Sequence, residues 1–316
     1  MSTINIVGTG GIIEGNLGAA DVDVNLDSSL YFDGNVNDDR IVVSDDNTAA
    51  TGDFGTGNFS VSAWFYIPEA GFTTSDSWGS ILGKGYTTSA PSGGWNILRA
   101  ATNNNIYWQN STDAGGAFAA SFGISPSGVE PYLGSWIHYC VTRNGTSMKL
   151  YVNGQLNNTA TASETSNLTN SGDFKIGTNN SNAQSANITV ADVKLFDDEL
   201  TAAEVQYLSS KVQADPDIGG LDNCESWWKI NEGTGTNVVN HKKGSANGTI
   251  TGAEWQYDKF SVDVYDNSTT TDGTFTVTQG KVEGLALTSA DFDGTASRID
   301  IGELGNYTAI SMTAWV

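Results

Sequence analysis

The sequence predicts an all-β protein built on an antiparallel two-sheet sandwich. Residues 59–65 place apolar side chains at every second position, which is the pattern of a strand with one buried face. An apolar run leads into Asn153-Gly154, a pair that favours tight hairpin turns because both positions tolerate positive φ. Glycine accounts for 37 residues, proline for 5, and aromatic residues for 10% of the chain. This composition is typical of a turn-rich folded protein and not of a disordered one.

Strand-like segments recur at short spacing, separated by turns of Gly and Asn. They lie at 31–32, 40–43, 59–65, 80–82, 95–98, 106–108, 136–143, 148–152, 173–177 and 188–196. One helix is expected, because Thr201 and Glu204 form a capping box and Val205 with Leu208 gives a short apolar stripe. The helix is expected to close the domain.

An internal duplication is the second organising feature. A Phe-Asp-Gly tripeptide, a short strand that begins with Arg and a strand that ends in Ala-Trp occur twice in the same order. They lie at 32–34, 40–43 and 59–64, and again at 292–294, 298–301 and 310–315. The second copy stops one residue after its Trp, so we expect the native chain to be longer than this sequence.

The charge of the chain excludes several classes of partner. Lys plus Arg number 14 against 36 carboxylates, which gives a net charge of −22. Such a surface repels nucleic acid and anionic membranes, and it is compatible with divalent cations, with cationic partners or with solubility alone. No run approaches the ~18 apolar residues of a membrane helix, and the first residues lack the pattern of a signal peptide. Cys140 and Cys224 lie in different expected domains, so no structural disulfide is expected.

Several of these segments resemble the laminin-G-like, concanavalin A-type family. The resemblance lies at the opening strand (32–34), a core strand (81–85), the central hairpin (136–145 and 148–154) and the closing strand with its helix (192–205). Their order and spacing cover about 29–212, and the resemblance implies that this region is a jelly roll. Residues 228–236, 247–255 and 280–284 resemble the first strands of a second such domain.

Four parts are therefore expected along the chain. They are an N-terminal extended arm at 1–28, a laminin-G-like jelly roll at 29–212, a linker at 213–220 and the N-terminal part of a second, truncated jelly roll at 221–316. The arm cannot bury a core by itself, so we expect it to dock on its own domain or on a neighbouring subunit. The second copy lacks the central hairpin and the closing strand, which would leave open sheet edges.

The family resemblance also implies a calcium site. Asp33 and Asp192 occupy positions that carry acids in the family pattern, whereas Ala191 replaces an acid often found beside the latter. Carboxylate and carbonyl oxygens are the ligands that calcium prefers. The alternative is that Asp33 belongs to a turn and that the other acids of its segment are solvated.

Aromatic residues in loops suggest a second kind of site. Phe72, Trp78 and Tyr86 fall in a stretch rich in Gly, Ser and Thr, and an exposed flat ring with polar neighbours can stack on a sugar. Trp95 and Trp108 sit in strand-like alternation and are expected in the core. Trp78, Tyr86 and Phe72 are therefore the predicted carbohydrate-binding residues.

Catalytic patterns find little support. The two histidines, His138 and His241, lie in different expected domains, and there is no Gly-x-Ser-x-Gly elbow or His-x-x-x-His metal pair. Glycoside hydrolysis needs two carboxylates about 5 to 10 Å apart, and no strand from 59 to 196 presents such a pair of glutamates. We therefore expect no enzyme activity.

The leading hypothesis is a virion structural or surface protein of a bacteriophage, a fibre, decoration or tail-associated protein that binds host-surface glycans. Its expected partners are other virion proteins, reached through the arm at 1–28, and further copies of itself in a homo-oligomer. Neither nucleic acid nor a membrane is an expected partner. The alternative is a secreted bacterial carbohydrate-binding adhesin, and a glycosidase ranks below both.

Overall fold

The structure, a computed structural model, shows two compact units. One comprises residues 29–255, and the other comprises residues 1–28 with 256–316. The described residues are 3–8, 11–16, 24–26, 28–34, 39–72, 78–87, 93–210, 212–257, 261–265, 273–278, 281–283, 298–301 and 311–314.

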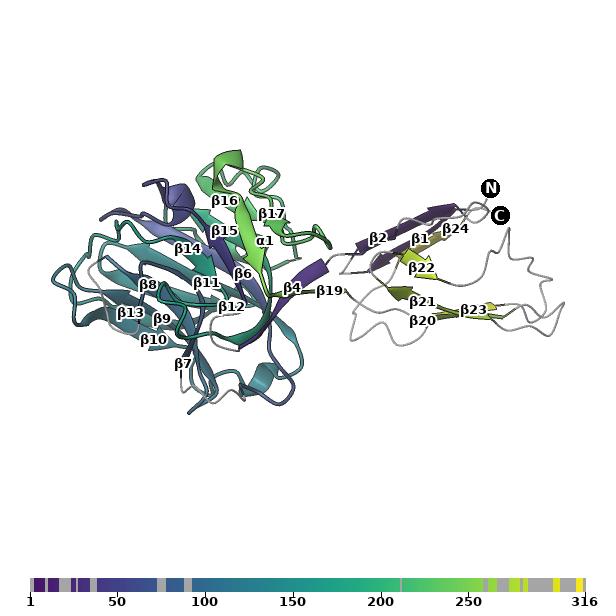
Figure 1. The fold of residues 1–316 in the computed structure, drawn as a ribbon, viewed down its shortest axis with the longest axis horizontal. Helices are drawn as coiled ribbons and strands as arrows, with labels where there is room; N and C mark the ends of the chain where they lie inside the picture. The colour runs from purple at the N-terminus through teal and green to yellow at the C-terminus, as the bar shows by residue number, and fades with distance from the viewer. Residues whose placement is uncertain are drawn as a thin grey trace. The chain divides into compact units, whose positions relative to one another are not determined.

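The larger unit is a sandwich of two antiparallel sheets (Figure 1). In the first sheet the strand order is β10-β9-β8-β7-β14-β5-β18-β17. The strands are β5 (Arg40–Val43), β7 (Trp78–Lys84), β8 (Trp95–Ala100), β9 (Asn105–Ser111), β10 (Phe118–Gly123), β14 (Phe174–Ile176), β17 (Asn237–Val238) and β18 (Gly248–Thr251). Three short 3₁₀ turns, η1 (Ala49–Thr51), η2 (Glu130–Tyr132) and η3 (Gly244–Ala246), lie in the connections.

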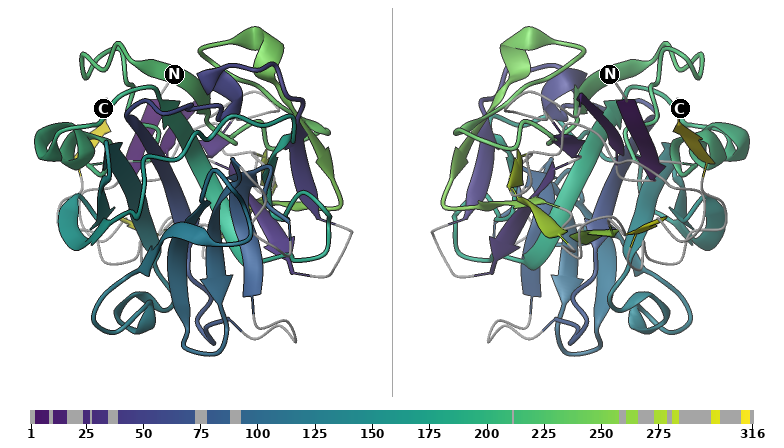
Figure 2. Two further views of the ribbon diagram at one scale, coloured as in Figure 1. Left: turned by 90° about the vertical axis from the view of Figure 1, so that its left-hand side faces the viewer. Right: turned by 90° about the vertical axis from the view of Figure 1, so that its right-hand side faces the viewer.

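The second sheet has the order β13-β12-β11-β6-β15-β4-β19, and β16 pairs with β15 beside this path. Figure 2 shows the two sheets as facing layers. The strands are β4 (Ser28–Asp33), β6 (Phe59–Tyr66), β11 (Trp136–Asn144), β12 (Ser147–Val152), β13 (Gln155–Thr161), β15 (Asn187–Phe196), β16 (Cys224–Trp228) and β19 (Glu254–Tyr257). The predicted all-β jelly-roll sandwich is thus confirmed.

The predicted helix is present as α1 (Ala202–Leu208), and it begins with the predicted capping box. Thr201 accepts a hydrogen bond from the Glu204 backbone, while the Glu204 carboxylate accepts one from the Thr201 backbone. Val205 and Leu208 are buried in a cluster that also contains Cys140 and Phe196, residues of the second sheet. The helix therefore covers the outer face of that sheet.

A ladder of aromatic rings forms the centre of the sandwich. Trp108 stacks on Trp95 with a centroid distance of 5.3 Å, Trp95 contacts Phe174 at 5.9 Å, and Phe174 stacks on Trp228 at 5.1 Å. All four residues are buried. The last of these four rings, Trp228, belongs to β16, a strand that we expected to lie in a second domain.

The boundary predicted at 213–220 does not separate two units, because the compact unit continues to Trp255. Strand β16 pairs with β15 and β18 pairs with β5, so the segment completes both sheets. Ile230 and Ile250 are buried in the same core cluster as the strands of 29–212. The residues of the expected linker form turns that carry the chain from α1 to β16, and Leu221 donates a backbone hydrogen bond to Pro216 there.

The smaller unit contains two four-stranded antiparallel sheets. One has the order β24-β1-β2-β3, so the N-terminal arm is not merely extended but forms a hairpin whose first strand pairs with the last strand of the chain. The other has the order β22-β21-β20-β23. The strands are β1 (Thr3–Gly8), β2 (Gly11–Asn16), β3 (Val24–Leu26), β20 (Ser261–Tyr265), β21 (Gly273–Thr278), β22 (Lys281–Glu283), β23 (Arg298–Ile301) and β24 (Ser311–Ala314).

Two strands of the repeat recur as predicted, since β23 and β24 fall where the second copy requires strands. The second Phe-Asp-Gly, at 292–294, lies outside the described residues. For residues 256–316, a second jelly roll therefore stays a prediction. The first part of that expected domain, through Trp255, belongs to the first sandwich.

Candidate functional site

The outer face of the first sheet is formed by alternate residues of β7 to β10. One row across the strands contains Ser80, Leu98 and Tyr107, and the next contains Asn96 and Gln109. Their immediate neighbours along the strands, such as Trp95 and Trp108, point into the core. Because side chains alternate along a strand, the two rows face away from the sandwich interior.

An exposed aromatic pair lies at one end of this face. Trp78, the first residue of β7, has 39% of its surface exposed. Its ring contacts Tyr107 of β9 with a centroid distance of 5.8 Å and an interplanar angle of 59°. The Tyr107 hydroxyl accepts a hydrogen bond of 2.6 Å from the Asn103 amide. Trp78 therefore offers one ring face to solvent while Tyr107 supports it.

A second aromatic pair lies further along the same strands. Phe118 of β10, also 39% exposed, stacks on Tyr86 with a centroid distance of 6.3 Å and an angle of 14°. Tyr86 itself is buried, and burial raises the pKa of its hydroxyl. That hydroxyl donates to Gln109 Oε1 at 3.1 Å, and Gln109 Nε2 donates to Ser121 Oγ at 3.0 Å. These two hydrogen bonds hold the Gln109 side chain in place between Tyr86 and Ser121.

Charge is absent from the outer face of these four strands. None of the residues in Trp78–Lys84, Trp95–Ala100, Asn105–Ser111 or Phe118–Gly123 is Asp or Glu. The two charged residues of these strands, Lys84 and Arg99, pair in register with Trp95 and Ile106 and are fully buried. Ser80, Asn96, Gln109 and Ser111 of this face are themselves buried, so the groups that it exposes most are the rings of Trp78 and Phe118.

The three predicted carbohydrate-binding residues are not together. Trp78 and Tyr86 belong to this face, Trp78 as an exposed ring and Tyr86 as the support beneath Phe118. Phe72 is 6% exposed and belongs to the core cluster, with the Arg99 guanidinium 6.0 Å from its ring centroid. The structure therefore assigns Phe72 to the core, because so little of its ring reaches the surface.

Sequence reasoning missed Tyr107 and Phe118. Tyr107 lies between Ile106 and Trp108, so strand alternation places it opposite these core residues, and that signal was available. Phe118 follows Gly115-Gly116-Ala117, a context that does not indicate a strand. Its place beside Tyr86 is decided by the pairing of β10 with β9.

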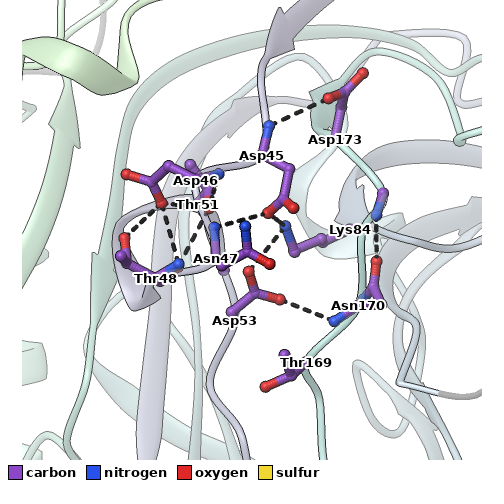
Figure 3. A network of polar contacts seen from close by, with 12 residues as sticks. Asp45, Asp46, Asn47, Thr48, Thr51, Asp53, Lys84, Thr169, Asn170 and Asp173 are labelled. Carbon is purple, nitrogen blue, oxygen red and sulfur yellow. Dashed lines mark hydrogen bonds and ion pairs between the residues drawn. The ribbon is translucent and has the colours of Figure 1, made fainter.

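A polar network joins three segments at the rim of the sandwich (Figure 3). The Lys84 ammonium, fully buried, lies 2.5 Å from Asp45 Oδ1 and 3.2 Å from Asp53 Oδ2. Burial raises the pKa of Asp53 despite hydrogen bonds from Asn170 and Lys84. Burial also acts to raise the pKa of Asp45, but hydrogen bonds from Lys84 and Asn47 outweigh it and lower that pKa.

The network continues on both sides of Lys84. Asp46 accepts hydrogen bonds from the hydroxyls of Thr48 and Thr51. It also forms an ion pair with Lys243, with 3.2 Å between the charged atoms. Asp173 accepts one from the Asp45 backbone. The carboxylates are therefore matched by lysines and hydrogen-bond donors, and the described residues contain no group of three or more acidic, His or Cys side chains arranged to hold a metal ion.

Asp192 was predicted as a calcium ligand, and its neighbours do not fit that role. One carboxylate oxygen forms a buried ion pair with Lys194 and accepts a hydrogen bond of 2.7 Å from the Trp227 indole. The other oxygen accepts one of 2.8 Å from the Gln213 backbone. Asp192 is 1% exposed, so a lysine fills the place of a cation and the side chain fastens the segment after α1 to the sheet.

Asp33, the other predicted ligand, is exposed at the end of β4. Its backbone donates a hydrogen bond of 2.7 Å to the Asp39 carboxylate. Residues 35–38, which include the neighbouring Asp38, lie outside the described part of the chain. Calcium at Asp33 stays a prediction.

The second sheet contains a buried Ser–His pair, formed by Ser62 of β6 and His138 of β11. Ser62 Oγ and His138 Nε2 are 2.8 Å apart, and both residues are almost completely buried. Burial, and then the charge of Lys194, lowers the pKa of His138 to about 3. Burial likewise raises the pKa of Cys224 to about 12. All three residues are buried, so we interpret their arrangement as structural.

The fold defines a jelly-roll protein, and the outer face of β7 to β10 exposes the rings of Trp78 and Phe118 and carries no Asp or Glu. Residues 35–206 match the model of the concanavalin A-like lectin/glucanases superfamily. This match covers more than half of the chain, and the chain belongs to that superfamily. No helix among the described residues has the length and apolar character required to cross a membrane.

Solved structures share this fold at low identity. A candidate carbohydrate-binding protein of Bacteroides ovatus is similar with a TM-score of 0.52 at 13% identity, over 73% of this chain and 60% of that one. A SAP-like pentraxin of Limulus polyphemus follows with 0.42 at 16%, over 61% and 84%. The receptor binding domain of botulinum neurotoxin D gives 0.44 at 16%, over 88% and 62%. A search of curated proteins finds no match.

Proposed function

We propose that this chain is a non-enzymatic carbohydrate-binding protein and that the glycan lies on the outer face of β7 to β10. The observation that carries the proposal is the Trp78 ring, 39% exposed and in contact with the ring of Tyr107. Sugars present apolar C–H faces and hydroxyl groups, so an exposed ring with hydrogen-bonding neighbours suits both. The name of the Bacteroides relative supports the same class of ligand.

The composition of this face supports binding without hydrolysis. Glycosidases of the usual kind place two carboxylates across the scissile bond, about 5 to 10 Å apart. Strands β7 to β10 carry neither Asp nor Glu. A sugar on this face would therefore meet no carboxylate from these strands.

Exchanging the exposed ring tests the proposal. We expect Trp78→Ala to weaken binding on a glycan array at least tenfold, since truncation of an aromatic hot-spot residue typically costs about 2 kcal/mol. Trp136→Ala is the matched control, because Trp136 forms a similar pair with Tyr66 at 5.8 Å on the other sheet. Equal binding by wild type and Trp78→Ala, or an equal loss in Trp136→Ala, would contradict the proposal.

The proposal also includes the biological setting in which the protein binds carbohydrate. The chain is a surface component of a bacteriophage particle, which it joins through the N-terminal hairpin and in which it assembles with further copies of itself. The strands formed by the arm and the acidic, disulfide-free β architecture support this setting. The alternative is a secreted bacterial adhesin. Mass spectrometry of purified virions from the host culture separates the two, because an adhesin would be absent from the particles.

A further inference from the structure

The end of β7 places a lysine amine between two aspartates in the polar network at the rim of the sandwich (Figure 3). Lys84 Nζ lies 2.5 Å from Asp45 Oδ1 and 3.2 Å from Asp53 Oδ2. The side chains of Lys84 and Asp53 are 0% and 2% exposed, whereas that of Asp45 is 13% exposed. Groups held about 3 to 3.5 Å apart in a fixed orientation react far faster than the same groups free in solution. The arrangement is therefore that of a nucleophile beside two carboxyl groups.

Neighbouring residues hold the amine and one of the carboxyl groups in place. The Asn170 backbone donates a hydrogen bond of 3.0 Å to Asp53 Oδ1. The stem of Lys84 packs over Gly52, where a Cβ atom would lie 3.4 Å from Lys84 Cδ and 2.8 Å from the Trp95 ring. Trp95 in turn donates a hydrogen bond of 2.9 Å to the Gly52 carbonyl. Asp53 Oδ2 differs from Oδ1, because no amide or hydroxyl among the described residues donates a hydrogen bond to it. Oδ2 is therefore the oxygen that can be displaced.

The two carboxyl groups differ in protonation. Burial raises the pKa of Asp53 and favours its neutral form. Burial acts on Asp45 in the same direction, but hydrogen bonds from Lys84 and Asn47 outweigh it and lower the pKa of Asp45. A neutral carboxylic acid is open to attack by an amine, whereas an ionised carboxylate can accept the proton of an adjacent ammonium group. Asp53 thus suits the role of acceptor, and Asp45 suits that of general base.

We propose that Lys84 and Asp53 condense to an amide, an isopeptide cross-link that the chain forms on itself with Asp45 as the general base. Lys84 Nζ gives one proton to Asp45, and the nitrogen lone pair then forms a bond to the Asp53 carboxyl carbon. The bond from that carbon to the hydroxyl oxygen breaks, and the hydroxyl leaves as water with a second proton from the nitrogen. The third proton stays on the amide. The only product released is water, so the reaction needs no further reactant.

Burial favours the cross-link over its hydrolysis, because water has little access to side chains that are 0% and 2% exposed. The amide would join the loop after β5 to the end of β7, two strands that have β14 between them in the sheet. Such a link lowers the entropy of the unfolded chain in the way that a disulfide does, and reducing agents do not break it. Both cysteines, Cys140 and Cys224, are free, so this would be a kind of covalent link that the cysteines do not supply.

Intact-mass spectrometry of the full chain in denaturing solvent tests the inference without any substitution. We expect the wild type to be lighter than its sequence by one water molecule, and tandem mass spectrometry to find the peptides of Lys84 and Asp53 joined. Lys84→Met should have the full mass of its own sequence. Lys149→Met is the matched control and should keep the loss of water, because Lys149 pairs at 2.7 Å with Glu199 at the surface, away from this network.

Asp45→Asn tests the general base. The variant keeps the amine and the acceptor but lacks the group that takes the proton, so we expect most molecules to retain the full mass. Thermal unfolding shows whether each variant is folded, and the mass of the wild type stays decisive if one is not.

A wild type at the full mass of its sequence overturns the inference. A loss of water located at another pair of residues, or one that persists in Lys84→Met, also overturns it. Complete cross-linking in folded Asp45→Asn overturns the role of Asp45. None of these measurements involves a sugar, so their outcome is independent of the proposed carbohydrate-binding function.

Discussion

Two lysines, Lys84 and Lys194, show how single residues decide what the acidic clusters of this chain do. Each ammonium group is fully buried against aspartates, Lys84 against Asp45 and Asp53 and Lys194 against Asp192. A buried charge is tolerated only when it is paired, and removal of one partner leaves the other uncompensated. The family resemblance implied a metal site at Asp192, and nothing in the sequence showed that Lys194, two residues further on, turns inward to pair with it.

His138 gives a prediction for pH. The folded protein keeps this buried imidazole neutral down to a pKa of about 3, whereas the unfolded chain protonates it near 6.5. The unfolded state therefore binds more protons between these values, and stability falls as pH drops below 6.5. We expect this residue to contribute a slope of about 1.4 kcal/mol per pH unit.

Urea unfolding of wild type and His138→Gln between about pH 7 and pH 5 measures that contribution. The glutamine side chain can still hydrogen-bond to Ser62 but does not titrate, so its free energy of unfolding should fall less steeply with acid. Parallel pH profiles for the two proteins would show that His138 is not buried as a neutral group.

Among the secondary-structure elements, those from β16 to β18 depart from the predicted organisation, because they belong to the first sandwich. Their sequence resembles the opening strands of a second domain, yet β16 and β18 pair with β15 and β5 of the first. The resemblance predicted strands at 247–255, where β18 and β19 lie. It could not identify the sheet that the strand joins, because pairing depends on which strand edges are left open by the rest of the chain.

Trp228→Ala tests whether this segment belongs to the core. Trp228 is fully buried, stacks on Phe174 and donates a hydrogen bond of 2.8 Å to the Ala246 carbonyl. Its truncation should lower the free energy of unfolding by about 3 to 5 kcal/mol, measured by denaturant unfolding of the full chain. Trp136→Ala, at a half-buried position, should cost clearly less, and equal costs would contradict the pairing of β16 with the first sandwich.

At the scale of the whole molecule, the charge of −22 sets the electrostatics. Like charges repel across a compact fold and destabilise it, and salt screens this repulsion. The Debye length falls from about 30 Å at 0.01 M to about 10 Å at 0.1 M salt. Stability should therefore depend on ionic strength beyond the contribution of any single ion pair.

Differential scanning calorimetry should show a higher Tm at 0.1 M than at 0.01 M NaCl, with KCl giving the same shift. Calcium chloride at matched ionic strength tests the predicted site at Asp33, since a bound ion would raise the Tm further. A Tm that falls as NaCl is added would show that paired charges, and not repulsion, dominate the surface.

Local patterns in the sequence predict the all-β class, the strands of 29–212, the capped helix and Trp78 as an exposed ring. Each of these follows from a local pattern: alternation along residues 59–65, the capping box at Thr201, or the polar stretch around Trp78. The folded structure was needed to show that Phe72 is core, that Phe118 completes an aromatic pair and that residues 224–255 finish the first sandwich. These outcomes depend on strand pairings between residues far apart in the chain, and such pairings determine burial without leaving a local pattern.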